Sequence, residues 1–275
     1  MPIPENEQLR APEVEAPQEA AQETGTLAPA WHTVLLLAGI LAASVHGAQI
    51  AGMGSAPNRL SIYAMTAVLE LAMLGWVAFG MRLRGIPLRS LLGSVRGDAR
   101  SWMQDIGVAL VFWMAVLMIL GSLGLIWSGM EEVVMHRKAE AHAAHPLAPS
   151  PSQQEAIRAV AQLAPGNATE IAGWILLCAL AGFVEEVVFR GYLQRQFTAW
   201  ASGGAAAGVV FSALAFGAAH GYQGVRNMAL LAVFGVLFSL LALFRRSLRS
   251  CIFAHSWHDL VAGLAVAALR SHHLI

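Results

Sequence analysis

The sequence predicts an all-α fold, a polytopic transmembrane helical bundle with about seven spans and a polar cavity inside the membrane. Of the 275 residues, 57% are hydrophobic and only 12% are charged, about half the charge of a soluble domain. Apolar windows close to the roughly 20 residues that cross a bilayer recur along the chain. The formal net charge is zero, so the composition gives no indication of nucleic-acid binding.

The N-terminal region, residues 1–30, is predicted to be a disordered acidic tail. It carries six glutamates among proline, alanine and glutamine, and Arg10 is its one basic residue. Such a composition cannot bury enough apolar surface to fold. The region also lacks the basic start and apolar centre of a signal peptide, so the first apolar segment is expected to be a retained span.

The remaining chain divides into residues 31–127 with three spans, a polar loop over residues 128–169, and a helical core over residues 170–270 with four spans. The fifth span is short and rich in glycine and alanine, which allows close contact between helices. The predicted spans cover residues 31–53, 60–81, 105–127, 171–190, 205–220, 227–244 and 251–269.

The polar loop contains three histidines, His136, His142 and His145. Three imidazoles in one segment are compatible with a metal site. The surrounding prolines and polar residues favour the alternative, an exposed irregular loop. The two cysteines, Cys178 and Cys251, both lie in apolar segments and are expected to be small core residues.

Arginine placement predicts the orientation of the chain. Ten basic residues follow the second, fourth and sixth spans, against six on the opposite side, so the positive-inside rule makes the first side cytoplasmic. The N-terminus is then cytoplasmic and residues 128–169 are outside. Abundant alanine, glycine and arginine, with Lys138 as the single lysine, indicates a bacterial inner membrane.

The most informative motif lies at the end of the fourth span, where Glu185 and Glu186 are followed by Arg190. Ionisable groups within a membrane are costly, need partners and mark functional sites. Glu186 and Arg190 are four residues apart and can pair on one helix face. Glu185 is rotated by about 100°, so it is predicted to be the carboxylate that acts on a substrate or water.

Two further motifs follow in the later spans. His220 lies four residues after Phe216, and Asp259 lies four residues after His255. A carboxylate one helical turn from an imidazole can orient it and fix its tautomer. His258 points to another side of the same helix and is a weaker candidate.

One carboxylate and two imidazoles from three helices can converge on one water molecule. The set can act as a general base with oxyanion-stabilising donors. It can equally hold a divalent metal such as zinc that activates the water. Both alternatives predict hydrolysis of an amide inside the membrane.

Each group also has a purely structural interpretation. The Glu186–Arg190 pair alone is typical of a structural ion pair, and a single buried histidine such as His220 is typical of a hydrogen-bonded core residue. Glu70 in the second span is expected to pair with a polar group of a neighbouring span or to lie near water. The occurrence of all three motifs in the last four spans favours a functional site.

These motifs resemble the CPBP family of intramembrane proteases, which includes the CAAX prenyl endopeptidases of the Ras-converting type and the bacterial Abi proteins. The family pattern is EExxxR, then FxxxH, then HxxxN or HxxxD. The resemblance covers about residues 168–269. The matching residues are Glu185, Glu186 and Arg190, then Phe216 and His220, then His255 and Asp259.

The resemblance implies an intramembrane endopeptidase that cuts a membrane-associated, prenylated or otherwise lipid-modified peptide or protein. Glu185 would activate water, and His220, His255 and Asp259 would complete the site, with Glu186, Arg190 and Phe216 in support. The family is labelled metalloprotease, although a glutamate-dependent mechanism without metal has been argued for its prenyl-protein members. Either a divalent metal or no cofactor is therefore expected.

One departure from the pattern is Asp259, where asparagine is common in the prenyl-protein proteases. An ionised aspartate accepts hydrogen bonds but cannot donate them. It favours a charged imidazole at His255 or a metal. It also weakens the inference, from the resemblance, that the substrate is prenylated.

Two alternatives come from other classes of protein. One is a non-proteolytic scaffold or immunity protein that keeps the fold and binds a membrane partner; the complete set of polar residues argues against it. The other is an electron-transfer protein with haem between His220 and His255, which leaves Glu185 and Glu186 without a role.

A shared site makes demands on helix geometry. Straight spans place Glu185 and His220 toward opposite membrane faces. The fourth helix is therefore expected to continue past Arg190 toward Trp200, and the fifth to tilt or stop within the bilayer beside a wet cavity. Glu185 and His220 are then predicted to lie within about 15 Å of each other.

Overall fold

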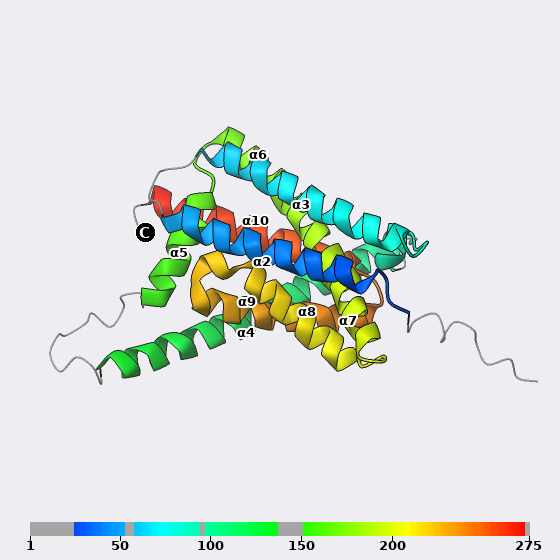
Figure 1. The fold of residues 1–275 in the computed structure, drawn as a ribbon. Helices are drawn as coiled ribbons and strands as arrows, with labels where there is room; N and C mark the ends of the chain where they lie inside the picture. The colour runs from blue at the N-terminus through cyan, green and yellow to red at the C-terminus, as the bar shows by residue number, and fades with distance from the viewer. Residues whose placement is uncertain (1–24, 53–57, 94–96, 137–150, 273–275) are drawn as a thin grey trace, which may run out of the picture.

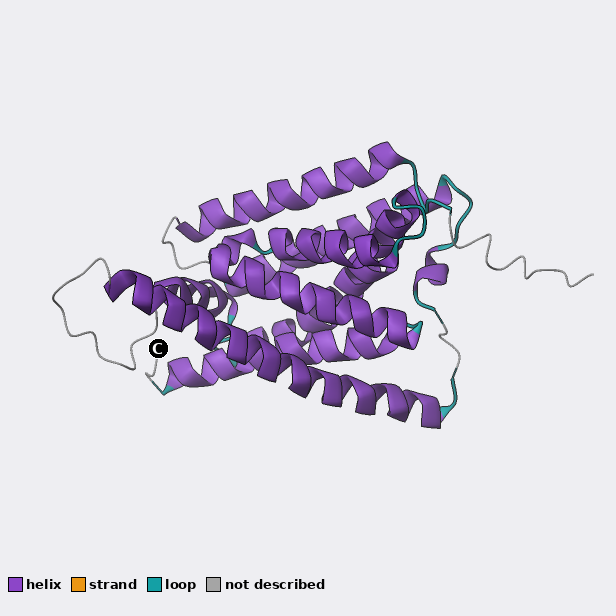
Figure 2. Ribbon diagram, turned by 90° about the horizontal axis from the view of Figure 1, so that it is seen from below, coloured by secondary structure: helices purple, strands orange, loops and turns teal. Residues whose placement is uncertain are grey.

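The computed structural model describes residues 25–52, 58–93, 97–136 and 151–272, and the regular structure within these ranges is helical (Figures 1 and 2). Residues 1–24 of the predicted acidic tail lie outside the described part. The helices are α2 (Ala30–Gly52), α3 (Arg59–Arg82), the short η1 (Leu88–Leu91), α4 (Ala99–His136), α5 (Pro151–Leu163), α6 (Ala168–Glu185), the π-helix η2 (Glu186–Leu193), α7 (Gln194–Trp200), α8 (Ala205–Ala219), the short η3 (Gly221–Gln223), α9 (Gly224–Arg245) and α10 (Arg249–Ser271).

The length and composition of the helices confirm the predicted all-α polytopic bundle. Within the described ranges, six helical stretches are long and apolar enough to cross a membrane, and α8, with 15 residues, is a shorter seventh apolar helix. Large apolar side chains such as Val111, Met118 and Leu125 are more than 70% exposed, as expected of a surface that faces lipid tails. The chain is an integral membrane protein.

The fourth span is one continuous rod of 33 residues, Ala168–Trp200, made of α6, η2 and α7. This confirms the predicted continuation past Arg190. The middle segment η2 is a π-helix, a rare form that is frequently found at functional sites. Ser212 of α8 supports it there, because its hydroxyl donates to the carbonyl of Phe189 at 2.6 Å.

The prediction of an irregular loop over residues 128–169 is wrong for two segments. The helix α4 continues to His136, and residues Pro151–Leu163 form α5 (Figure 1). A search for apolar windows does not find α5, because an amphipathic helix has only one apolar stripe and carries polar residues on its other faces. Its C-terminal end is anchored to α10, where Arg270 donates to the carbonyls of Ala161 and Ala164 at 3.1 Å each.

The helices α3 and α6 run side by side in the same direction (Figure 1). Both begin with an asparagine cap: Asn58 accepts from the amide of Leu60, and Asn167 accepts from that of Glu170. Near these caps Arg59 reaches Glu170 at 3.3 Å. The shared register carries residue 70 of α3 to about one helical turn before the glutamates at the end of α6.

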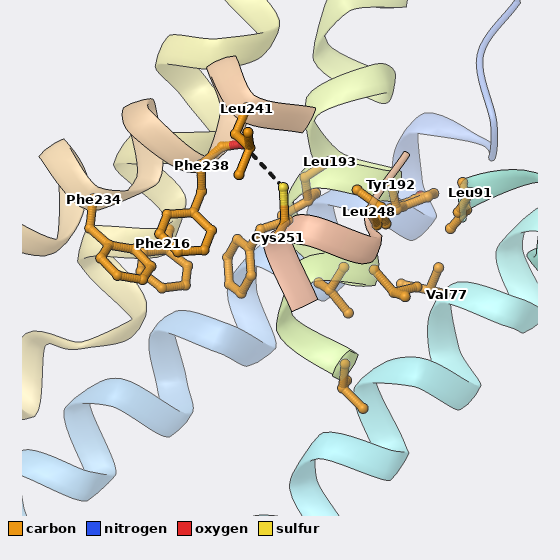
Figure 3. Packing of buried hydrophobic residues seen from close by; sticks show 14 of the residues in the cluster. Val77, Leu91, Tyr192, Leu193, Phe216, Phe234, Phe238, Leu241, Leu248 and Cys251 are labelled. Atoms are coloured by element: carbon orange, nitrogen blue, oxygen red, sulfur yellow. Dashed lines mark hydrogen bonds between the residues drawn. The ribbon is translucent and has the colours of Figure 1, made fainter. Parts of the chain in front are cut away.

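Side chains of η2, α8, α9 and α10 meet in the apolar core (Figure 3). Phe234 stacks on Phe238 with ring centroids 4.0 Å apart and on Phe216 at 5.6 Å. Cys251 donates to the carbonyl of Phe238, and both Cys251 and Cys178 are buried free thiols, as expected of core residues. This aromatic stack packs against residues of the polar motifs, because Phe234 and Phe238 contact the ring of His255.

Candidate active site

The two adjacent glutamates lie at the junction of α6 and η2, in the middle of the fourth span. The side chains of Glu186 and Arg190 are fully buried and form an ion pair, with 3.0 Å between Arg190 Nη1 and Glu186 Oε1. This is the pairing predicted from their spacing. The Glu185 side chain is 14% exposed, so of the two carboxylates only this one reaches an accessible surface.

His255 of α10 is held by Glu186, a contact that the motif spacing did not predict. The Nδ1 atom of His255 lies 2.8 Å from Glu186 Oε1, the same oxygen that pairs with Arg190. A carboxylate at this distance accepts the Nδ1 proton and leaves Nε2 for other partners. The sequence favoured Asp259 as the group that orients His255, and the structure assigns the shorter contact to Glu186.

The Nε2 atom of His255 faces both remaining carboxylates. It lies 3.7 Å from Glu185 Oε2 and 3.7 Å from Asp259 Oδ2. These separations exceed a direct hydrogen bond, and such a spacing is typical of groups that a shared water bridges. Glu185 Oε2 is enclosed and has no hydrogen-bond partner among the described residues. The three groups therefore surround a point where a polar molecule can bind.

Exposure separates the two sets of motif residues. The side chains of Glu186 and Arg190 are sealed at 0%, whereas those of Glu185 and Asp259 are 14% and 31% exposed. The buried pair, Glu186 and Arg190, can stabilise the site, whereas Glu185 and Asp259 are accessible enough to contact a substrate.

Aromatic rings support the buried guanidinium. The Arg190 Cζ atom lies 4.3 Å from the centroid of Phe216 and 5.3 Å from that of Phe238. A cation over an aromatic face is stabilised by the ring quadrupole, most strongly where water is excluded. Phe216, predicted as a supporting residue, thus links the arginine to the end of α8.

His220 lies where α8 ends and is brought to the same region. Its Nδ1 atom donates to the carbonyl of Phe216 at 2.8 Å, which leaves Nε2 available. The Phe216 ring lies 4.8 Å from the His220 ring and 5.8 Å from the His255 ring. The two imidazoles cannot be farther apart than the sum of these distances, and His255 in turn reaches Glu185. The structure therefore brings Glu185, His220, His255 and Asp259 together.

Glu70 of α3 belongs to this group more closely than its isolated position in the sequence indicated. It is 6% exposed, and its Oε2 atom has no hydrogen-bond partner among the described residues. Its carboxyl group interacts electrostatically with those of Glu185 and Asp259. The expected pairing with a polar group of a neighbouring span is not found at Oε2 within the described residues, and the alternative, a position near water, stays a prediction.

The remaining histidines contribute less. His258 packs on Phe234, with ring centroids 5.3 Å apart, and its enclosed Nδ1 atom has no hydrogen-bond partner in the described part of the chain. His136 is the last residue of α4, whereas His142 and His145 lie outside the described residues.

Metal and haem place different demands on these residues. No three His, Cys, Asp or Glu side chains within the described ranges are arranged to hold a metal ion. The Nδ1 atoms of His220 and His255 have protein partners, so a metal at this site would bind through their Nε2 atoms, with Glu185 and Asp259 as the available carboxylates. A haem between His220 and His255 would need the space where the Phe216 ring contacts both imidazoles.

The predicted polar cavity stays a prediction. A cavity of about 270 Å³ between α3 and α6 is apolar, with Tyr63, Ala67 and Leu180 in its lining. Sequence reasoning also missed Tyr222 and Ser44, which the fold places beside His220. A tyrosine in a turn and a serine in a span carry no spacing signal that could have identified them.

Comparison with known proteins supports the family assignment. Residues 167–261 match the family model described as "Type II CAAX prenyl endopeptidase Rce1-like". No curated protein and no solved structure is significantly similar to the chain. The matched segment contains all three motifs and the helices α6 to α9 with the first half of α10. Residues 167–261 of this integral membrane protein are thus similar to the type II CAAX prenyl endopeptidases of the Rce1-like type.

Proposed function

We propose that this protein is an intramembrane endopeptidase in which Glu185 activates water for hydrolysis of a peptide bond. The observation that carries the proposal is the position of His255 Nε2, which lies 3.7 Å from the carboxylate oxygens of both Glu185 and Asp259. A water molecule in reach of all three has a base to take its proton and an imidazole to orient it.

The first step is attack by this water on the carbonyl carbon of the scissile bond. Glu185 accepts one water proton as the oxygen–carbon bond forms, and the carbonyl electrons move onto its oxygen. His220 and His255 donate to that oxygen through Nε2 when they are protonated, and the carboxylates around His255 balance the charge of its imidazolium. Preorganised donors of this kind stabilise the charge that develops in the transition state.

In the second step the carbon–nitrogen bond breaks. Glu185 returns the proton to the leaving nitrogen, so that one residue acts first as base and then as acid. Glu186 accepts from Arg190 and from the Nδ1 atom of His255 throughout. Its role is to fix the imidazole, in the way that second-sphere carboxylates orient histidines.

The substrate class follows from the position of the site within the span Ala168–Trp200. A peptide must enter the membrane to reach it, so the substrate is a membrane-associated or lipid-modified peptide or protein. Prenylated proteins, the class implied by the family name, are one kind of such substrate. Because Asp259 differs from the asparagine common in the prenyl-protein proteases, we do not restrict the substrate to prenylated proteins. We place the enzyme in a bacterial inner membrane with its N-terminus in the cytoplasm, from the distribution of arginines.

Comparative peptidomics tests this function. Membranes of cells that carry the wild-type protein or the Glu185→Gln variant are compared by mass spectrometry, without prior choice of substrate. We expect a small set of membrane-associated peptides to accumulate uncut in the variant and to be shortened in the wild type. Identical peptide profiles would contradict a protease function and favour a scaffold or immunity protein that binds a membrane partner.

Removal of divalent metals is expected to leave cleavage by the purified enzyme unchanged within the error of the assay. The reason is that the proposed step needs only Glu185 and a water held by His255 Nε2, and no three His, Cys, Asp or Glu side chains within the described ranges are arranged to hold a metal. The measurement is the cleavage rate after treatment with a chelator, with a zinc-dependent protease in the same buffer as control. Loss of activity that added zinc restores would move Glu185, His220 and His255 into a metal site.

A further inference from the structure

We propose that the hydroxyl of Tyr222 is a further catalytic donor at this site, which hydrogen-bonds the carbonyl oxygen of the scissile bond as that oxygen becomes an oxyanion. This inference rests on the endopeptidase function proposed above and assigns a role to a residue outside all three motifs. It arises from the corner of the chain that directly follows His220.

The corner is built to hold Tyr222 in one position. The helix α8 ends at Ala219, and Gly224 has a φ of +86°, a backbone conformation that a side chain would strain. Ser44 of α2 fixes the turn from the other side: its hydroxyl accepts from the amide of Gly221 at 3.0 Å and donates to the carbonyl of Ala218 at 2.8 Å. A residue on a turn pinned in this way is held rigidly, as a catalytic group requires.

Close packing against α2 positions the ring of Tyr222. A Cβ atom added at Gly47 would lie 3.5 Å from Tyr222 Cβ and 3.8 Å from its Cγ. The glycine therefore lets the helix backbone approach the base of the tyrosine side chain. On its other side the Tyr222 ring lies 6.1 Å from the ring of His220.

The hydrogen bonds of Tyr222 leave its proton available. The amide of Gln223 donates to the Tyr222 hydroxyl oxygen at 2.9 Å, and the amide of Asn227 donates to Gln223 Oε1 at 3.1 Å. A hydroxyl whose oxygen accepts is strengthened as a donor, because successive hydrogen bonds polarise one another. This relay gives the Tyr222 hydroxyl a defined direction in which to donate.

The hydroxyl lies in the same region as the acidic residues. It interacts electrostatically with Glu185 and Asp259, the two carboxyl groups that face the proposed water, and with Glu70. Those groups accept hydrogen bonds when ionised, whereas an oxyanion needs donors. Asp259 cannot donate when it is ionised, and Tyr222 supplies a donor beside these acceptors.

The step remains balanced with this residue included. Water adds to the carbonyl carbon, Glu185 holds the proton that the water loses, and the carbonyl oxygen takes the electron pair. Tyr222 donates a hydrogen bond and keeps its proton, so no charge is transferred to it. When the carbon–nitrogen bond breaks, the oxygen becomes a carbonyl oxygen again and the proton on Glu185 goes to the leaving amine.

The test is Tyr222→Phe, which removes one oxygen atom and keeps the ring that packs on Gly47. The substrate is a synthetic copy of a peptide whose cleavage in membranes depends on Glu185, and the enzyme is full-length protein in lipid nanodiscs. We expect kcat to fall by about 10²- to 10³-fold, the effect of removing one oxyanion donor. KM and the melting temperature should stay at their wild-type values. A peptide aldehyde of the same sequence, whose hydrate resembles the intermediate, should bind more weakly to the variant, whereas the uncut peptide should bind equally well.

The chain has three tyrosines, so Tyr63→Phe and Tyr192→Phe are matched controls. Their hydroxyls bond to the carbonyl of Leu163 and to the hydroxyl of Thr33, respectively, away from the acidic groups. These variants should lose stability and keep kcat. Wild-type kcat in Tyr222→Phe, with cleavage lost in Glu185→Gln, would overturn the role of Tyr222 alone. Cleavage that persists in Glu185→Gln would overturn the proposed function and this inference together.

Discussion

Replacement of Glu185 by glutamine is expected to lower kcat for peptide-bond cleavage by about 10²- to 10⁴-fold, the usual contribution of a general base. Glutamine has the shape of glutamate but cannot take a proton from water. Glu185 Oε2 has no hydrogen-bond partner among the described residues, and its contact with His255 Nε2 is 3.7 Å long, so the substitution breaks no direct hydrogen bond of this oxygen. Relief of repulsion with Glu70 and Asp259 should keep or raise the melting temperature.

The neighbouring variant Glu186→Gln is the control for this result. It removes the same charge one residue away, and it breaks the ion pair with Arg190 at 3.0 Å and the bond to His255 at 2.8 Å. We expect it to lower stability as well as activity, whereas Glu185→Gln lowers activity alone. The measurements are steady-state kinetics and thermal unfolding on the same preparations. Wild-type cleavage by Glu185→Gln would remove this residue from its assigned role.

Replacement of Arg190 by methionine is expected to destabilise the protein by about 3–5 kcal/mol, the cost of leaving one partner of a buried ion pair uncompensated. Methionine keeps much of the length and apolar contact of the arginine stem. The carboxylate of Glu186, whose side chain is fully buried, would lose the guanidinium that pairs with it at 3.0 Å. Reversible unfolding in detergent micelles measures the change in the free energy of unfolding.

A double variant and a second arginine make this result specific. Arg190→Met combined with Glu186→Gln removes both charges, so it should recover most of the lost stability without recovering activity. Arg245→Met is the matched control. Its partner Asp105 keeps Arg249 at 2.6 Å, so the loss there should be much smaller. Equal destabilisation by Arg190→Met and Arg245→Met would contradict the importance of the buried pair.

Local sequence patterns were sufficient for the bundle and for one contact of the site. Apolar windows predicted the spans, because a helix that crosses lipid must be apolar along its length. The i,i+4 spacing predicted the Glu186–Arg190 pair, because both residues lie on one rod. The same method missed α5, whose apolar residues form one stripe of a mostly polar helix and not a continuous window.

Contacts between helices could not be predicted from these local patterns. The bond from His255 to Glu186 joins residues 69 positions apart in the sequence, and the bond from Ser44 to Gly221 joins residues 177 apart. Helical periodicity fixes which residues share a face of one helix, but it does not fix which face meets which neighbour. That choice depends on packing of whole helices, as between α8 and α9.

By itself the sequence determined that this is a helical membrane protein with Glu185, His220, His255 and Asp259 as its candidate site, because composition and short-range spacing are local properties. Only the tertiary structure decided that Glu186 holds His255, that Glu70 interacts with the other acidic groups, and that Ser44 of α2 bonds the turn after His220. The physical reason is that a buried charge takes its partner from whichever helix packs against it.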